Sequence, residues 1–228
     1  RFQTQAPFPA LRPRRLRAHP ALRAMVRETH LIPADLIWPI FVMAGEDSSE
    51  PVSSMPGVSR HTVDRLPALA SKAHSLGIPA ICIFPYTDPA LKTEDCREAW
   101  NPDNLPNRAI RAIKDAVPDV MVMTDIALDP YNINGHDGIV RDGEIVNDET
   151  VAALVKMGQA QAQSGADILG PSDMMDGRIG ALRAMLEQNS FQNVSILSYS
   201  AKFSSAFYGP FRDAVGARGA LTGDKTTY

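Results

Sequence analysis

Short apolar runs alternate with segments of helical periodicity along most of this chain. Residues 36–43 form a nearly continuous apolar run, as expected for a strand buried on both faces of a sheet. Further runs at 78–84, 119–125, 166–170 and 194–199 have the length of buried strands. Between them, apolar residues recur at helical spacing over 63–76, 105–116, about 148–164, and 179–188. Repeated strand-then-helix units with short links predict a parallel sheet.

A polar insertion at 129–148 interrupts this alternation. Inside it, Asp142-Gly143 separates two β-branched pairs, Ile139-Val140 and Ile145-Val146. An Asp-Gly pair readily adopts the positive φ angles of a type I′ turn. Residues 139–146 are therefore predicted to form a β-hairpin.

Polar side chains lie at or just beyond the ends of three predicted strands: Asp125, Ser172, Asp173 and Lys202. In (β/α)8 barrels the carboxyl ends of the strands carry the catalytic groups. No Gly-x-Gly-x-x-Gly opens a helix and no Gly-Lys-Ser/Thr loop is present, which disfavours a nucleotide-binding fold. The predicted fold is an α/β TIM-type (β/α)8 barrel over 36–228, with about five of its eight strands in this sequence.

Composition narrows the functional class further. The 228 residues include 23 Lys plus Arg and 26 Asp plus Glu, so the net charge of -3 argues against a protein specialised for nucleic acids or membrane surfaces. No apolar run approaches the roughly 20 residues of a membrane helix. Cys82 and Cys96 form no C-x-x-C pair, and we expect a reducing, cytoplasmic location.

The first 35 residues differ from the rest, because they are rich in arginine and proline and poor in acidic residues. They lack the apolar core of a signal peptide and the serines of a transit peptide. We interpret residues 1–35 as an extended N-terminal arm that packs on a partner subunit. A basic arm that binds nucleic acid is the alternative interpretation.

Lys202 carries the most specific chemistry, because it follows an apolar strand among small and aromatic neighbours. Burial disfavours the ammonium form, so we expect the pKa of Lys202 to fall. A neutral amine can attack a ketone and form a Schiff base. Arg212, ten residues later, and Lys225 are cations that could hold a substrate carboxylate. The alternative is that all three are solvated surface groups.

Asp125, Ser172 and Asp173 could orient a substrate amine or relay protons. Ser172 and Asp173 could equally be helix N-caps, because the next predicted helix begins shortly after them.

Several segments together resemble the 5-aminolevulinate dehydratase (porphobilinogen synthase) family. They are Phe84-Pro85, Glu94-Asp95-Cys96-Arg97-Glu98-Ala99 with Asn101-Pro102-Asp103-Asn104, the run from Asp125 to Tyr131, the run from Pro171 to Arg178, and the run from Ser198 to Asp213. They occur in the family's order from about Arg12 to Tyr228. The resemblance implies condensation of two 5-aminolevulinate molecules to porphobilinogen through lysine Schiff bases, with loss of two waters. This is a lyase step of tetrapyrrole biosynthesis.

The resemblance also assigns roles to residues of this chain. It implies that Lys202 is the Schiff-base lysine of the A-side substrate, whose carboxylate Arg212 and Lys225 hold. It places Asp125 and Ser172 at the substrate site with Asp173 in support, and it adds two aromatic residues of the motif to substrate binding, Tyr199 and Phe207. The family's second Schiff-base lysine lies in a Val-Lys-Pro motif that this sequence does not contain. We therefore expect the sequence to be the first two thirds of the enzyme.

The same resemblance bears on metals and on assembly. Zinc-dependent members carry three cysteines where this chain has Ala127, Asp129 and Asp137. We expect no zinc and no active-site cofactor, whereas Mg²⁺ or K⁺ as an activator and complete metal independence both stay open. The arm implies a homo-oligomer, an octamer or hexamer built from dimers.

Two alternative functions stay open at this point. One is a class I aldolase-like lyase, which needs only one Schiff-base lysine. The other is an inactive, truncated barrel that only assembles with partner subunits.

Overall fold

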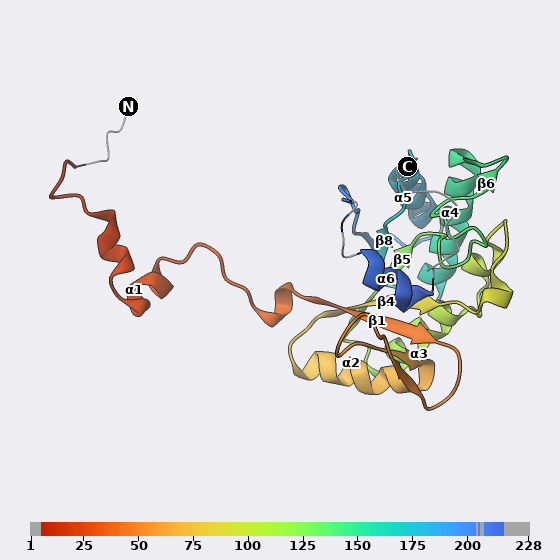
Figure 1. The fold of residues 1–228 in the computed structure, drawn as a ribbon, viewed down its shortest axis with the longest axis horizontal. Helices are drawn as coiled ribbons and strands as arrows, with labels where there is room; N and C mark the ends of the chain where they lie inside the picture. Colours follow the sequence, from red (N-terminus) through yellow and green to blue (C-terminus); the bar gives the residue numbers. More distant parts are fainter. Residues whose placement is uncertain (1–5, 204, 206–207, 217–228) are drawn as a thin grey trace.

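The computed structural model describes residues 6–203, 205 and 208–216 of the chain. A mostly parallel sheet forms its centre, in the order β2-β3-β1-β4-β5-β8-β9 (Figure 1). The strands are β1 Ile37–Met43, β2 Ser49–Pro51, β3 Ser59–Thr62, β4 Ala80–Tyr86, β5 Met121–Ile126, β8 Ile168–Pro171 and β9 Ser195–Ile196. All neighbours pair in parallel except β2 and β3. The predicted parallel α/β sheet is thus confirmed.

All five apolar runs form strands, within a few residues of their predicted bounds. Pro39 lies in β1 opposite Cys82 of β4, while β3 pairs with β1 only from Phe41 onward. At Pro39, strand β1 therefore has a neighbouring strand on one side only, and a strand tolerates proline at such an edge position. The prediction missed β2 and β3, because their polar sequences carry no apolar run.

Helices follow the strands as the spacing predicted. The α-helices are α1 Pro20–Met25, α2 Leu66–Ser75, α3 Leu105–Ala116, α4 Asn147–Gln163, α5 Arg178–Gln188 and α6 Tyr208–Val215. Short 3-10 helices are η1 Pro13–Arg17, η2 Pro33–Asp35, η3 Val63–Arg65, η4 Pro89–Leu91 and η5 Arg97–Trp100. None of the helices in the described part of the chain is both long and apolar enough to cross a membrane.

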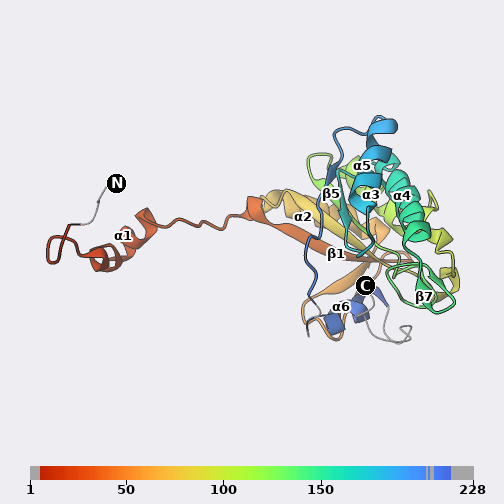
Figure 2. The ribbon, with the colours of Figure 1, turned by 90° about the horizontal axis from the view of Figure 1, so that it is seen from above.

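The two faces of the sheet carry different partners. Helices α2 to α5 cover one face, and the main core lies between them and strand residues such as Ile40, Val42 and Ile81 (Figure 2). Helix α6 lies on the opposite side, where Ala214 and Val215 pack with Phe41. The alternation of side chains along β1 explains this division, since neighbouring residues of a strand point to opposite faces.

The predicted hairpin in the polar insertion is confirmed. Strands β6 Val140–Arg141 and β7 Glu144–Ile145 pair antiparallel. Asp142 and Gly143 between them have φ angles of 51° and 84°, the left-handed values that a type I′ turn requires. The insertion is therefore an ordered segment beside the sheet.

Residues 6–36 run away from the sheet as an extended segment that carries η1, α1 and η2 (Figures 1 and 2). Large apolar side chains on this segment are exposed, among them Phe8, Met25 and Leu31 at 75%, 80% and 79%. The division into an arm of 1–35 and a barrel of 36–228 stays a prediction.

Candidate functional site

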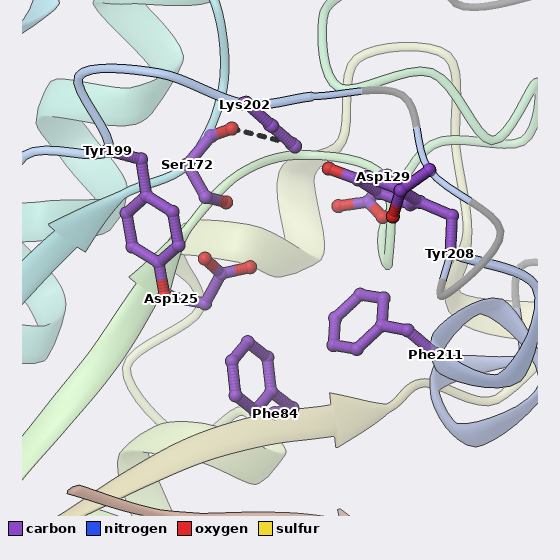
Figure 3. A pocket seen from close by; sticks show the side chains of 9 residues that line it. Phe84, Asp125, Asp129, Ser172, Tyr199, Lys202, Tyr208 and Phe211 are labelled. Carbon is purple, nitrogen blue, oxygen red and sulfur yellow. Dashed lines mark hydrogen bonds between the residues drawn. The ribbon is translucent and has the colours of Figure 1, made fainter. Parts of the chain in front are cut away.

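A cavity of about 270 Å³ lies beyond the carboxyl ends of β4, β5 and β8, beside α6 (Figure 3). Its lining combines carboxylates, one lysine, hydroxyl groups and aromatic rings: Phe84, Asp125, Asp129, Ser172, Tyr199, Lys202, Ser205, Tyr208 and Phe211. Parallel strands end at the same edge of the sheet, which is why residues far apart in the chain meet here. Four of the predicted site residues thus line one cavity: Asp125, Ser172, Tyr199 and Lys202.

Lys202 reaches into this cavity from the segment after β9. Its Nζ donates to the backbone carbonyl of Ser172 at 2.6 Å (Figure 3). The same Nζ lies 3.4 Å from Oδ2 of Asp137. The Lys202 side chain is 17% exposed and the Asp137 side chain 1%. Lys202 is therefore a desolvated amine inside the site, as predicted, and the alternative of a solvated surface lysine is wrong.

The predicted charge of Lys202 is wrong, however. Burial is the largest single effect and by itself lowers the pKa of Lys202. Asp137, together with Tyr208 and further carboxylates, raises it, and the net pKa lies above that of an ordinary lysine. Lys202 is thus an ammonium at neutral pH. The sequence marked Asp137 only as a possible metal ligand. Its pairing with Lys202, which bridges 65 positions of the chain, was not predicted.

Asp125 is the penultimate residue of β5 and is almost fully buried. Burial raises its pKa to about 6, although a hydrogen bond from Ser172 and the charge of Lys202 oppose the shift. Its Oδ1 atom has no hydrogen-bond partner among the described residues. Near neutral pH this carboxyl group exists in both forms, so it can donate or accept a proton.

Asp173 follows the cavity residue Ser172 in the chain and does not itself line the cavity. Its carboxylate is 0% exposed, forms a 3.0 Å ion pair with Arg178 and accepts from the backbone N–H of Met175 at 2.9 Å. Burial raises the pKa of Asp173 to about 6. The capping alternative is wrong, because α5 begins at Arg178 and its N-cap residue is Gly177.

The structure describes only one of the two cations predicted to hold the substrate carboxylate, Arg212. Arg212 lies on α6 with its guanidinium 5.9 Å from the ring centre of Tyr208, and it does not line the cavity. Lys225 and Phe207 lie outside the described residues. Three aromatic residues of the cavity lining were not predicted as site residues, although all three occur in the segments that carried the family resemblance: Phe84, Tyr208 and Phe211.

The three expected metal positions hold one alanine and two aspartates, and the absence of zinc stays a prediction. Ala127 has no ligand atom, Asp137 is paired with Lys202, and Asp129 lines the cavity. In the described part of the chain, no three His, Cys, Asp or Glu side chains gather as a metal site. Cys82 and Cys96 are buried and free, and burial raises the pKa of Cys96 to about 12. Their thiols therefore stay protonated.

The chain is similar to known proteins over most of its length. A family model described as "Delta-aminolevulinic acid dehydratase" matches residues 10–228. The chain is 58% identical to the delta-aminolevulinic acid dehydratase of Rhodobacter capsulatus, covering 97% of this chain and 67% of that protein. Identity to the one from Bradyrhizobium diazoefficiens is 52%, covering 96% and 62%. The chain thus spans about two thirds of the length of these two relatives.

A solved structure gives the same result for the fold. The delta-aminolevulinic acid dehydratase (porphobilinogen synthase) of Toxoplasma gondii, in complex with the reaction product porphobilinogen, superposes with a TM-score of 0.92 at 47% identity. The match covers 96% of this chain and 62% of that one. The described sheet and helices therefore have the arrangement found in that structure.

Proposed function

Because the chain belongs to the delta-aminolevulinic acid dehydratase family, we propose that it condenses two molecules of 5-aminolevulinate to porphobilinogen with loss of two waters. The proposal rests above all on Lys202, whose Nζ lies inside the cavity beside Asp137 and the Ser172 carbonyl. An amine in this place can form an imine with the ketone of a small keto acid.

The charges around Lys202 define the first steps. The ammonium must lose a proton before it attacks, and Asp137 at 3.4 Å is the nearest carboxylate to receive it. The carbinolamine that forms must then lose water, which requires an acid. Asp125, with a pKa of about 6, is present in its protonated form in part of the molecules near neutral pH and can supply that proton.

The resulting protonated imine is an electron sink, so the carbon next to it loses a proton more readily. Carbon–carbon and carbon–nitrogen bond formation with a second 5-aminolevulinate follow. The aromatic rings of Phe84 and Phe211 exclude water from one side of the cavity, which strengthens the electrostatic interactions inside it. Arg212, whose guanidinium lies 5.9 Å from the ring centre of the cavity residue Tyr208, is our candidate for holding the substrate carboxylate.

We also propose a barrel architecture, an oligomeric assembly and a cellular location for this chain. The parallel sheet is part of a (β/α)8 barrel, supported by the TM-score of 0.92 to the Toxoplasma gondii structure. The exposed apolar side chains of residues 6–36 support an arm that packs on another copy in a homo-oligomer. A reducing, cytoplasmic location is supported by two free cysteines.

Reductive trapping tests the function directly. The full chain is incubated with 5-aminolevulinate and borohydride, and the modified peptide is mapped by mass spectrometry. We expect one adduct, at Lys202, and its loss in Lys202→Met. Lys156→Met is the control and should keep the adduct, because Lys156 packs on the ring of Trp100. Formation of porphobilinogen in the absence of borohydride then distinguishes the condensation from an aldolase-type reaction. Absence of any Lys202 adduct in the wild-type chain would overturn the proposal.

A further inference from the structure

Two side chains from distant segments hold the C-terminal turn of α6. Arg60 at the centre of β3 donates from Nε to the carbonyl of Ala214 at 2.7 Å and from Nη2 to the carbonyl of Asp213. Lys92, after η4, donates to the carbonyl of Gly216 at 3.3 Å. The Asp213 and Ala214 carbonyls belong to the last turn of α6, where carbonyls lack the N–H of a following helical turn, and Gly216 comes directly after the helix. The Asp213 carbonyl also accepts from the backbone N–H of Gly216 at 3.3 Å.

The contact made by Arg60 is well suited to this end of a helix. The last turn carries partial negative charge, and a guanidinium supplies two parallel charge-assisted hydrogen bonds. The Arg60 side chain is 15% exposed, and its guanidinium lies 4.4 Å from the ring centre of Tyr86. Stacking on Tyr86 fixes the plane of the guanidinium, so its two donors face α6 in one orientation.

Helix α6 in turn provides one wall of the cavity. Tyr208 and Phe211 project from it toward Lys202 and Phe84 (Figure 3). The Phe211 ring packs edge-on against Phe84 at 5.2 Å between ring centres and contacts Phe41 at 6.0 Å. A displacement of α6 would therefore change the cavity wall, including the Tyr208 ring whose centre lies 5.7 Å from Nζ of Lys202.

We propose that Arg60 is a positioning residue for the cavity, because it anchors the helix that carries Tyr208 and Phe211. The anchor joins positions 154 apart in the chain, and no sequence motif marked Arg60 as part of the site. Lys92 reinforces the anchor through a single bond at the following carbonyl. The effect on substrate binding rests on the proposed function, whereas the effect on α6 does not.

Hydrogen exchange tests the anchor independently of any activity. We expect the amides of α6 to exchange about tenfold faster in Arg60→Met than in the wild-type chain, with α3 unchanged. Arg65→Met is the matched control, since Arg65 lies five positions away, is half-exposed and pairs with Asp47. Unchanged exchange in α6 would overturn the proposal. If Arg60→Met does not fold, Arg60→Lys provides the same comparison, because it keeps the charge but loses the paired donors.

Substrate binding tests the second half of the inference. The concentration of 5-aminolevulinate that gives half-maximal borohydride trapping at Lys202 should rise about fivefold to tenfold in Arg60→Met, with an unchanged maximum. Arg60→Lys should lie between Arg60→Met and wild type. A rise in α6 exchange with unchanged half-saturation would refute a role for Arg60 in shaping the cavity. If the wild-type chain gives no adduct, the proposed function fails, and hydrogen exchange still decides whether Arg60 anchors α6.

Discussion

Asp137 should determine the protonation state of Lys202, and Asp137→Asn tests this while keeping the size of the side chain. Two unit charges at the observed 3.4 Å interact by about 5 kcal/mol at an effective dielectric constant near 20. Residual solvent contact and the remaining carboxylates Asp125 and Asp129 reduce the net effect. We therefore expect the pKa of Lys202 to fall by about one to three units in this variant.

Competitive acetylation measures this pKa without relying on any activity. Only the neutral amine reacts, so the labelling of the Lys202 peptide as a function of pH gives its midpoint. In the wild-type chain labelling should still be rising above pH 10.5, since the pKa of Lys202 lies above its ordinary value. In Asp137→Asn a plateau should appear at lower pH.

Asp119→Asn is the matched control, because Asp119 is an exposed carboxylate between α3 and β5. Its removal should leave the Lys202 midpoint unchanged. An equal or higher midpoint in Asp137→Asn would show that burial and the other carboxylates determine the charge of Lys202. The proposed transfer of a proton from Lys202 to Asp137 would then be wrong.

Three further predictions concern stability and metals. Asp125→Asn should raise the free energy of unfolding by about 1–3 kcal/mol at pH 7.5 and by much less at pH 4, because a carboxyl group with a raised pKa destabilises the fold only when it ionises. Urea unfolding at both pH values measures this, and an equal difference at the two pH values would contradict it. Gly216→Ala should lower the free energy of unfolding by about 1–3 kcal/mol in the same assay, because φ at Gly216 is 70° and an added Cβ would lie 2.5 Å from the Tyr86 ring. Gly180→Ala, where an added Cβ would meet open space, should instead stabilise α5 by about 0.5–1 kcal/mol. Treatment with a chelator should leave borohydride trapping at Lys202 unchanged, and loss of the adduct would reveal a required metal.

The strands of the sheet were predictable where they are buried on both faces. The apolar run of β4, for example, follows from the need to cover both sides of a parallel sheet. Strand β3 was not predictable, because Ser59–Thr62 is polar throughout and becomes a strand only by pairing with the exposed edge of β1. The hydrogen bonds from Arg60 of this strand to α6 were hidden for the same reason.

The site divides in a similar way. That Asp125, Ser172 and Lys202 converge follows from the sequence alone, because each comes at the end of a predicted parallel strand. The partner of Lys202 does not follow, since Asp137 lies in the polar insertion and its distance from the amine depends on the path of that loop. A pattern of residue types contains no information on that path.

The sequence by itself determined the five buried strands and the four helices between them, the edge of the sheet at which polar groups collect, and the family to which the chain is similar. These properties depend on local periodicity and on residue types at strand ends, which a linear chain carries completely. Only the tertiary structure decided that Lys202 is charged and that Arg60 anchors α6. Both depend on distances between segments far apart in the chain, and electrostatic and hydrogen-bond energies change steeply with those distances.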